Sequence, residues 1–140
     1  MHFHHYSLIH LSEAINENYA GQRIRECFTQ NKDELVIELK TGFLRIGCHT
    51  PLTFLVPVKE YARARRNVVE LFKEIYGYKL LKSRVVSQER TMILELEKET
   101  ELILKLHGPS SNIMLRVEGE IRSLFKQQRT QDFEFQEEGI

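Results

Sequence analysis

Histidines and cysteines come first among the residues that could support chemistry, because they are common ligands of transition metals. Histidine clusters near the start of the chain, at His2, His4, His5 and His10. Cys48 is followed directly by His49, but adjacent side chains on a strand point to opposite faces of a sheet and do not ligate one ion together. A zinc site needs several convergent ligands. We therefore expect no metal ion and no cofactor.

A basic stretch in the middle of the chain is the second candidate. Residues 59–84 contain eight Lys and Arg residues and three Glu residues, a net charge of +5, whereas residues 1–58 carry −1 and residues 85–140 carry −4. The zero net charge of the whole chain hides this asymmetry, which points to an anionic partner. One interpretation is a phosphate-contacting surface, since guanidinium groups bind phosphate oxygens bidentately. A solvated helix face that keeps the chain soluble explains the same residues.

Glu89 and Arg90 are the third candidate, at the tip of a predicted hairpin. They are either an ordinary charged turn or a carboxylate and a guanidinium held on a rigid sheet edge for a polar ligand. The loop His107–Asn112 contains Gly, Pro, Ser and Asn, which favour a structural corner over a ligand site. The sequence has no Gly-rich phosphate loop, paired-cysteine zinc signature or nucleophile elbow, so we expect no enzyme.

Length and composition indicate one globular domain. The chain has 140 residues, of which 41% are hydrophobic and 29% charged. These fractions allow a packed core and argue against whole-chain disorder. The longest apolar run, residues 54–58, is too short to span a bilayer, and the start shows no signal peptide. Two cysteines do not make a disulfide framework, so we expect a cytoplasmic protein that does not engage a membrane.

Two helices are expected to position these groups. The first covers residues 8–20, where apolar side chains recur at helical spacing, and it ends at Gly21. The second covers residues 59–77. Its apolar sector contains Tyr61, Ala64, Val68, Leu71, Phe72 and Ile75. Its opposite face carries Lys59, Arg63, Arg66, Glu70 and Lys73, which places the basic side chains along one line.

Alternating apolar residues predict strands over most of the remaining chain. The predicted strands cover residues 23–29, 35–39, 43–48, 52–56, 80–86, 92–97, 102–106, 113–117 and 121–125. Short loops favour antiparallel pairing between neighbours. The expected fold class is α+β, with antiparallel sandwich or meander sheets and two flanking helices. Residues 126–140 are polar and are expected to fray or to lead into further sequence.

Several stretches resemble the N-terminal domain of the NFACT family, which includes the RqcH-type ribosome quality-control proteins. Leu104–Leu115 resembles the family's strand–loop–strand signature around Gly-x-x-Ser-Asn-Ile. Gly21–Ile24 and Gln30–Leu35 resemble two earlier motifs, and Ala62–Asn67 with Leu71–Ile75 resembles one bacterial branch. The stretches occur in the family's order along nearly the whole chain.

The resemblance implies a fold similar to the β-sandwich domain of formamidopyrimidine-type DNA glycosylases. It implies a tRNA-binding domain, not a catalyst, in a factor that engages large ribosomal subunits with stalled peptidyl-tRNA and recruits tRNA for C-terminal tailing. Residues 1–135 would be this domain, and residues 136–140 a tail leading to a coiled coil and a C-terminal domain absent from this chain. Bacterial members are also called fibronectin-binding proteins, so the alternative is a surface adhesin domain.

The family also implies site residues. Its Asp-Arg pair corresponds to Glu89 and Arg90, so the arginine is kept and the acid is one methylene longer. A second family aspartate corresponds to His4, which supplies no fixed negative charge. The predicted nucleic-acid-binding residues are Glu89, Arg90, Arg63, Arg66, Lys73, Lys82 and Arg84. We expect them to share one continuous surface with Lys79.

Overall fold

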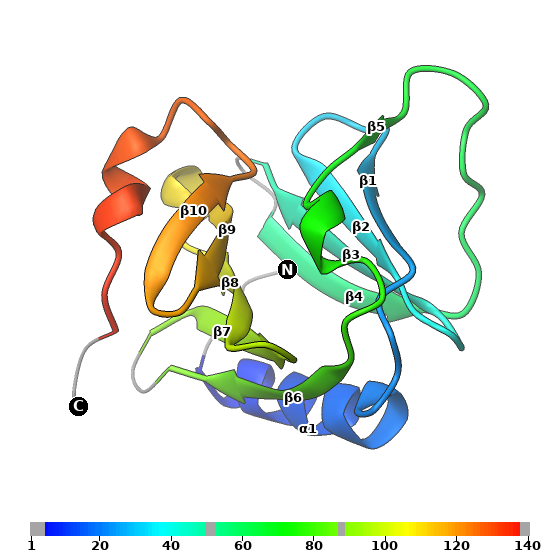
Figure 1. Ribbon diagram of the computed structural model, residues 1–140, viewed down its shortest axis with the longest axis horizontal. Coiled ribbons are helices and arrows are strands. Elements are labelled where there is room, and N and C mark those ends of the chain that lie inside the picture. The colour runs from blue at the N-terminus through cyan, green and yellow to red at the C-terminus, as the bar shows by residue number, and fades with distance from the viewer. Residues whose placement is uncertain (1–4, 50–52, 87–88, 138–140) are drawn as a thin grey trace.

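Two five-stranded antiparallel sheets and one α-helix make up the fold in this computed structural model (Figure 1). The structure describes residues 5–49, 53–86 and 89–137. The first sheet has the order β4-β3-β2-β1-β5 and contains β1 (Glu26–Thr29), β2 (Glu34–Glu38), β3 (Phe43–Cys48), β4 (Thr53–Val58) and β5 (Val69–Glu70). The second has the order β10-β9-β8-β7-β6 and contains β6 (Leu80–Val85), β7 (Thr91–Leu96), β8 (Thr100–Lys105), β9 (Asn112–Val117) and β10 (Glu120–Leu124). The expected α+β class with antiparallel sheets is therefore confirmed.

The main core lies between the two sheets and α1 (His5–Tyr19). Leu8 and Ile15 from the helix are fully buried, as the helical spacing predicted. In the first sheet, alternate residues such as Leu35 and Ile37 face this core, because side chains on a strand point alternately to its two faces. Burial of such side chains is the main favourable contribution to folding.

The second sheet is buried on both faces in its middle strands. Met92, Ile93 and Leu94 are consecutive in β7 and each is at most 1% exposed. The C-terminal segment covers the outer face, where Phe135 packs against a small cluster that includes Ile93. This segment contains the short 3-10 helix η3 (Thr130–Glu134), so the prediction that residues 126–140 fray is wrong for the part described, up to residue 137.

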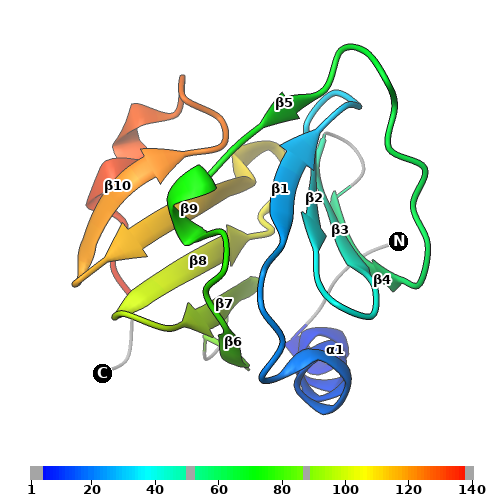
Figure 2. The ribbon, with the colours of Figure 1, turned by 45° about the vertical axis from the view of Figure 1, so that its right-hand side comes forward.

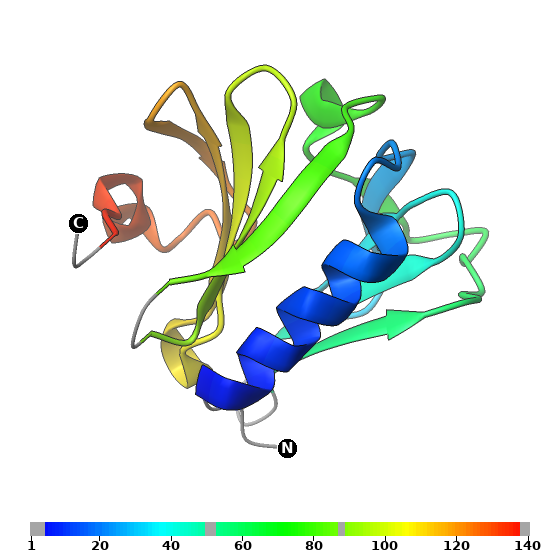
Figure 3. The same cartoon turned by 90° about the horizontal axis from the view of Figure 1, so that it is seen from below.

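Helix α1 protects the edge of β6, which runs beside it (Figure 3). The Ser83 N–H donates to Asn16 Oδ1 at 2.6 Å, and Asn16 Nδ2 donates to the Ser83 carbonyl at 3.0 Å. The Ser12 and Ser83 hydroxyls lie 2.6 Å apart. Helix side chains thus satisfy edge-strand backbone groups that would otherwise be open to another strand.

Asn16→Ala is expected to lower the free energy of unfolding by about 1–3 kcal/mol, because it leaves two part-buried backbone groups without partners. Urea denaturation measures this change. Asn18→Ala, in the same helix, removes only an exposed bond to the Ala14 carbonyl and should change stability by no more than about 0.5 kcal/mol. Equal effects of the two substitutions would contradict this role of Asn16.

The second predicted helix does not form. Residues 59–68 are irregular and extended, Val69–Glu70 is strand β5, and only Lys73–Ile75 is helical, as the single 3-10 turn η1. Asn67 and Phe72 have φ values of 60° and 51°, which an α-helix does not allow. Pairing of β5 with the edge of β1 holds this path. The prediction of two flanking helices is therefore corrected to one in the part described.

Strand β4 runs past the predicted range of residues 52–56 and includes Pro57. β4 is an edge strand of its sheet, where a missing N–H can face away from the ladder. No helix in the described ranges combines the length and apolar character needed to cross a membrane.

Candidate nucleic-acid interface

Residues 59–67 form an extended segment, here called the basic arm, at the right of Figure 1. The arm is fixed to the first sheet through its backbone. Gln30, just after β1, donates from Nε2 to the Ala62 carbonyl at 3.0 Å and accepts from the Ala64 N–H at 2.8 Å. One side-chain amide thus takes the hydrogen bonds that a helix would have supplied internally.

Aromatic packing holds the arm against the outer face of the first sheet. The Tyr61 ring centroid lies 5.8 Å from that of Phe28 and 6.0 Å from that of Phe43. The Arg45 guanidinium lies 5.5 Å from the ring centroids of both Tyr61 and Phe54, within cation–π range. These contacts make Tyr61 an anchor of the arm.

Arg63 is a second anchor and does not offer a free charge. Its guanidinium pairs with Glu26, lies 3.7 Å from Glu70 and sits 4.7 Å from the centroid of the Phe28 ring. Glu26 also raises the pKa of Arg63 by accepting its hydrogen bond. The sequence assigned Arg63 to a phosphate-contacting line, but in the fold it neutralises carboxylates.

Lys59, Arg65 and Arg66 are the available positive charges of the arm, beside the exposed acid Glu60. All three are exposed, and none has a hydrogen bond or an ion pair with any other described residue. Arg65 was outside the predicted set because the helical projection placed it off the basic line. The Arg65-Arg66 dipeptide was the available signal.

Arg90 directly precedes β7 of the second sheet, and its carbonyl accepts the Leu106 N–H at 2.8 Å. Its side chain is exposed. Next to it, the buried Thr91 hydroxyl lies 2.9 Å from His107 Nε2. Burial lowers the pKa of His107, and Lys105 and Arg90 lower it further. The hairpin-tip position of Glu89 and Arg90 is confirmed, and the fold adds His107 to their neighbourhood.

The Arg84 side chain forms three ion pairs on the outer face of the second sheet. Its guanidinium lies 2.6 Å from Glu95, 3.2 Å from Glu101 and 2.8 Å from Glu137. Arg116 bridges the last two of these carboxylates at 2.7 and 2.5 Å. Arg84 is therefore a structural residue here and does not present a free charge to a nucleic acid, contrary to its predicted place on that surface.

The predicted binding residues do not share one face. The basic arm, which contains Arg63 and Arg66, lies at the right of Figure 1, whereas the end of β6 and the start of β7, which Arg90 directly precedes in sequence, lie at the left. Figure 3 separates the two regions in the same way. Lys82 is exposed on β6, and Lys73 is exposed on η1. The expected single surface is wrong, and two separate basic regions replace it.

Glu137→Gln is expected to reduce the dependence of the free energy of unfolding on pH in the acid range. Hydrogen bonds from Arg84 and then Arg116 lower the pKa of Glu137 from 4.5 to about 2. A carboxyl with a depressed folded-state pKa stabilises the fold above its unfolded pKa, and this contribution disappears as pH falls from about 5 to 2. Urea unfolding across that range should show a shallower loss for Glu137→Gln than for the unchanged chain. Parallel curves would contradict the network's role.

The histidines and cysteines were the first candidates for chemistry in the sequence. No group of three or more His, Cys, Asp and Glu side chains suited to a metal ion occurs among them. His2 and His4, the latter matching the second family aspartate, lie outside the described residues. Cys27 and Cys48 are buried free thiols. Burial raises the pKa of both, that of Cys48 to about 12, which makes them poor nucleophiles.

The two packed antiparallel sheets with α1 define an α+β fold seen before in solved structures. No protein-family model matches the chain, and no curated protein matches it. The N-terminal domain of fibronectin-binding protein PavA from Streptococcus pneumoniae superposes with a TM-score of 0.76 at 16% identity, over 86% of this chain and 52% of that one.

Two further structures share the fold. The N-terminal part of the fibronectin/fibrinogen-binding protein from Streptococcus suis has a TM-score of 0.74 at 18% identity, covering 85% of this chain and 51% of that one. The fibrinogen-binding protein from Staphylococcus aureus has a TM-score of 0.69 at 16% identity, with coverages of 82% and 47%. The present chain thus spans about half the length of these structures. At such identities the likeness establishes the fold.

Proposed function

We propose that this domain is a non-catalytic RNA-binding module of a longer cytoplasmic protein of the NFACT type, in which it engages tRNA on the large ribosomal subunit. The observation that carries the proposal is the basic arm. Arg65 and Arg66 are exposed and have no described partner, while Gln30 and Tyr61 hold the arm rigidly beneath them. Preorganised cations bind phosphates without the cost of ordering a loop.

Arg90 supports the same proposal from the other end of the molecule. It matches the arginine of the family's Asp-Arg pair and is exposed beside Thr91 and His107. Two separate basic regions suit a large, folded RNA, which can contact both at once. Such divided contacts raise the overall affinity above that of either region alone.

A second candidate is a domain that binds fibronectin or fibrinogen at the cell surface. The names of the three structural neighbours favour this candidate over RNA. The basic arm and the motif resemblance favour RNA. Fractionation of cells that produce the native protein separates the two, because an adhesin requires a surface-exposed pool.

Arg65→Gln/Arg66→Gln is expected to weaken binding of a tRNA transcript about tenfold at ~0.1 M salt, since two phosphate contacts are lost. Fluorescence anisotropy measures the affinity. Lys98→Gln/Arg122→Gln removes the same charge from exposed positions in the second sheet's hairpins and should leave the affinity unchanged. Equal effects of the two double variants, or binding of plasma fibronectin and not of tRNA, would overturn the RNA proposal.

A further inference from the structure

A surface hollow of about 830 Å³ lies where α1 ends. It is formed by the residues between α1 and β1, the turn between β2 and β3, and the turn at Gly77. In Figure 2 the first of these segments starts at the end of α1, at the bottom, and runs up into β1. Its lining consists of Ala20, Gly21, Gln22, Arg23, Arg25, Lys40, Thr41 and Gly77. Three of these described residues are cations and none is an acid.

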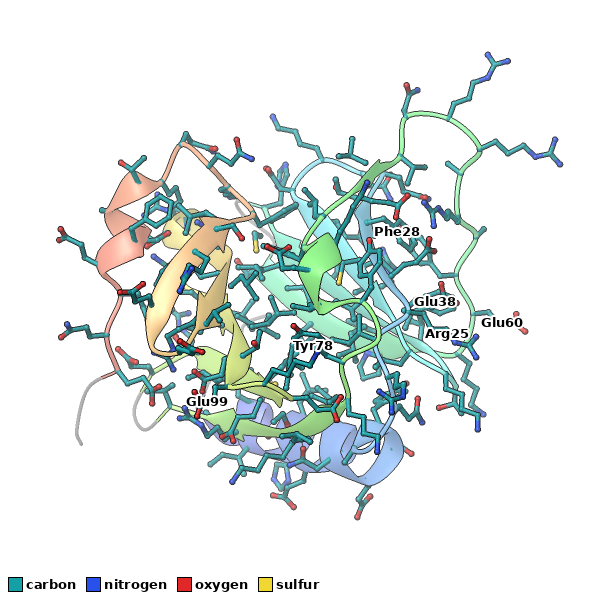
Figure 4. All side chains as sticks on the ribbon, in the orientation of Figure 1. Arg25, Phe28, Glu38, Glu60, Tyr78 and Glu99 are labelled. Atoms are coloured by element: carbon teal, nitrogen blue, oxygen red, sulfur yellow. The ribbon has the colours of Figure 1, made fainter. Side chains whose placement is uncertain are left out.

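The cations around the hollow are incompletely neutralised. Arg25 lies 3.9 Å from Glu38, at the edge of ion-pair range, and its side chain is 57% exposed (Figure 4). Lys40 is exposed and has no ion pair or hydrogen bond with a described residue. Arg23 donates to the Gly77 carbonyl at 2.7 Å and lies 3.5 Å from Glu97. Arg25 and Lys40 therefore keep donors for a ligand.

The frame of the hollow is preformed. Gln22 Nε2 donates to the Asn18 carbonyl at 2.9 Å and to Thr41 Oγ1 at 2.8 Å, and the Thr41 N–H donates to Gln22 Oε1 at 3.1 Å. This clamp ties the turn that carries Lys40 to the end of α1. Gly21 and Gly77 have φ values of 87° and 89°, and no atom beyond their chain neighbours lies within 4 Å of a Cβ position on either, so this part of the lining is uncrowded.

The charge of the lining distinguishes this hollow from a third one on the second sheet. A neighbouring hollow shares Thr41 and extends to Lys59, the first residue of the basic arm. By contrast, a hollow on the second sheet is lined by Glu95, Glu99, Glu101 and Glu118. The lining of the Lys40 hollow is therefore basic, whereas that of the second-sheet hollow is acidic, and an anion is favoured in the first.

We propose that the Arg23–Arg25–Lys40 hollow is an anion site that takes a phosphate group. Arg25 would bind two phosphate oxygens through its planar guanidinium and Lys40 would add a third contact as a point charge. The phosphate belongs either to a small phosphorylated compound or to an RNA backbone. The site binds phosphate in either case, so it goes beyond the proposed function and does not depend on it.

Titration of the ¹⁵N-labelled chain with inorganic phosphate, at constant ionic strength against chloride, tests the site. The amide shifts are expected to cluster at Gly21–Arg25, Lys40–Gly42 and Gly77, with a dissociation constant on the order of millimolar. Arg25→Gln/Lys40→Gln should weaken this binding at least about tenfold. Lys32→Gln/Arg122→Gln removes equal charge from other exposed positions and should leave the binding unchanged.

Shifts spread evenly over all exposed basic residues, or equal weakening by both double variants, would overturn the proposal. A second titration with a short single-stranded RNA identifies the source. Stronger shifts of the same amides with RNA than with phosphate assign the site to a nucleic-acid backbone, and the reverse assigns it to a small phosphate. If the chain binds phosphate at this site but does not bind RNA, the proposed function is contradicted and the phosphate site is retained.

Discussion

Asp132→Ala is expected to lower the free energy of unfolding by about 3–5 kcal/mol, because it strands a buried ammonium group. Lys105 Nζ lies 2.5 Å from Asp132 Oδ1, and the two residues are 7% and 4% exposed. Asn112 Nδ2 donates to the other carboxylate oxygen at 2.9 Å. Without Asp132, the charge of Lys105 has lost its partner, and the C-terminal segment has lost one of its attachments to β8 and β9.

Urea denaturation of Asp132→Ala measures this loss. The double variant Lys105→Met/Asp132→Leu removes both charges and fills the space with apolar groups, so it should be markedly more stable than Asp132→Ala. A double variant no more stable than the single one would show that the ion pair is not the cause. A loss below about 1 kcal/mol in Asp132→Ala would contradict its burial.

Phe28→Ala is expected to cost about 3–5 kcal/mol, the usual range for a large-to-small change at a buried aromatic residue. Phe28 is 1% exposed although it lies on the outer face of the first sheet, because Tyr61 and Arg63 cover it. The substitution removes the surface on which both anchors rest. It should therefore release the basic arm as well as destabilise the fold.

Two measurements check these consequences. Thermal or urea unfolding gives the stability loss, and Phe133→Ala is the matched control, since Phe133 is 47% exposed and should cost less than about 1 kcal/mol. Hydrogen exchange at the Ala64 amide, which donates to Gln30, reports on the arm. Unchanged protection at Ala64 in folded Phe28→Ala would contradict the anchoring role of Phe28.

The strands of the second sheet were predictable because periodicity reports burial directly. Residues 80–125 alternate over short segments joined by tight turns, and β6 to β10 follow those segments to within a few residues. Helix α1 was predictable for the same reason. In these regions local pattern and tertiary packing agree.

The segment 59–77 was mispredicted because its pattern suits two structures. Its apolar residues recur at helical spacing, yet Val69 pairs with the β1 edge and Gln30 binds the arm's backbone from 32 residues away in sequence. Tertiary contacts overrode local propensity, as they often do. The pattern of one segment contains no information about a partner so distant in the chain.

Contacts between residues distant in sequence also explain why some predicted site residues are structural and others are exposed. Arg84 looked like part of a basic surface, but its partner Glu137 lies 53 residues further along the chain. On the predicted helix, Arg65 lay off the line of basic residues, and it is an exposed cation because residues 59–67 are extended. Charge composition shows where basic residues concentrate in the sequence, and only the fold distinguishes anchoring arginines from exposed ones.

The salt dependence of tRNA binding tests the central claim most directly, that the basic arm contacts a nucleic-acid backbone. Affinity is measured at several salt concentrations for the unchanged chain, for Arg65→Gln/Arg66→Gln and for Lys98→Gln/Arg122→Gln. Two lost phosphate contacts should reduce the slope of log affinity against log salt by about 1.4–1.8 in the arm variant alone. A slope that is the same in all three proteins would contradict the account.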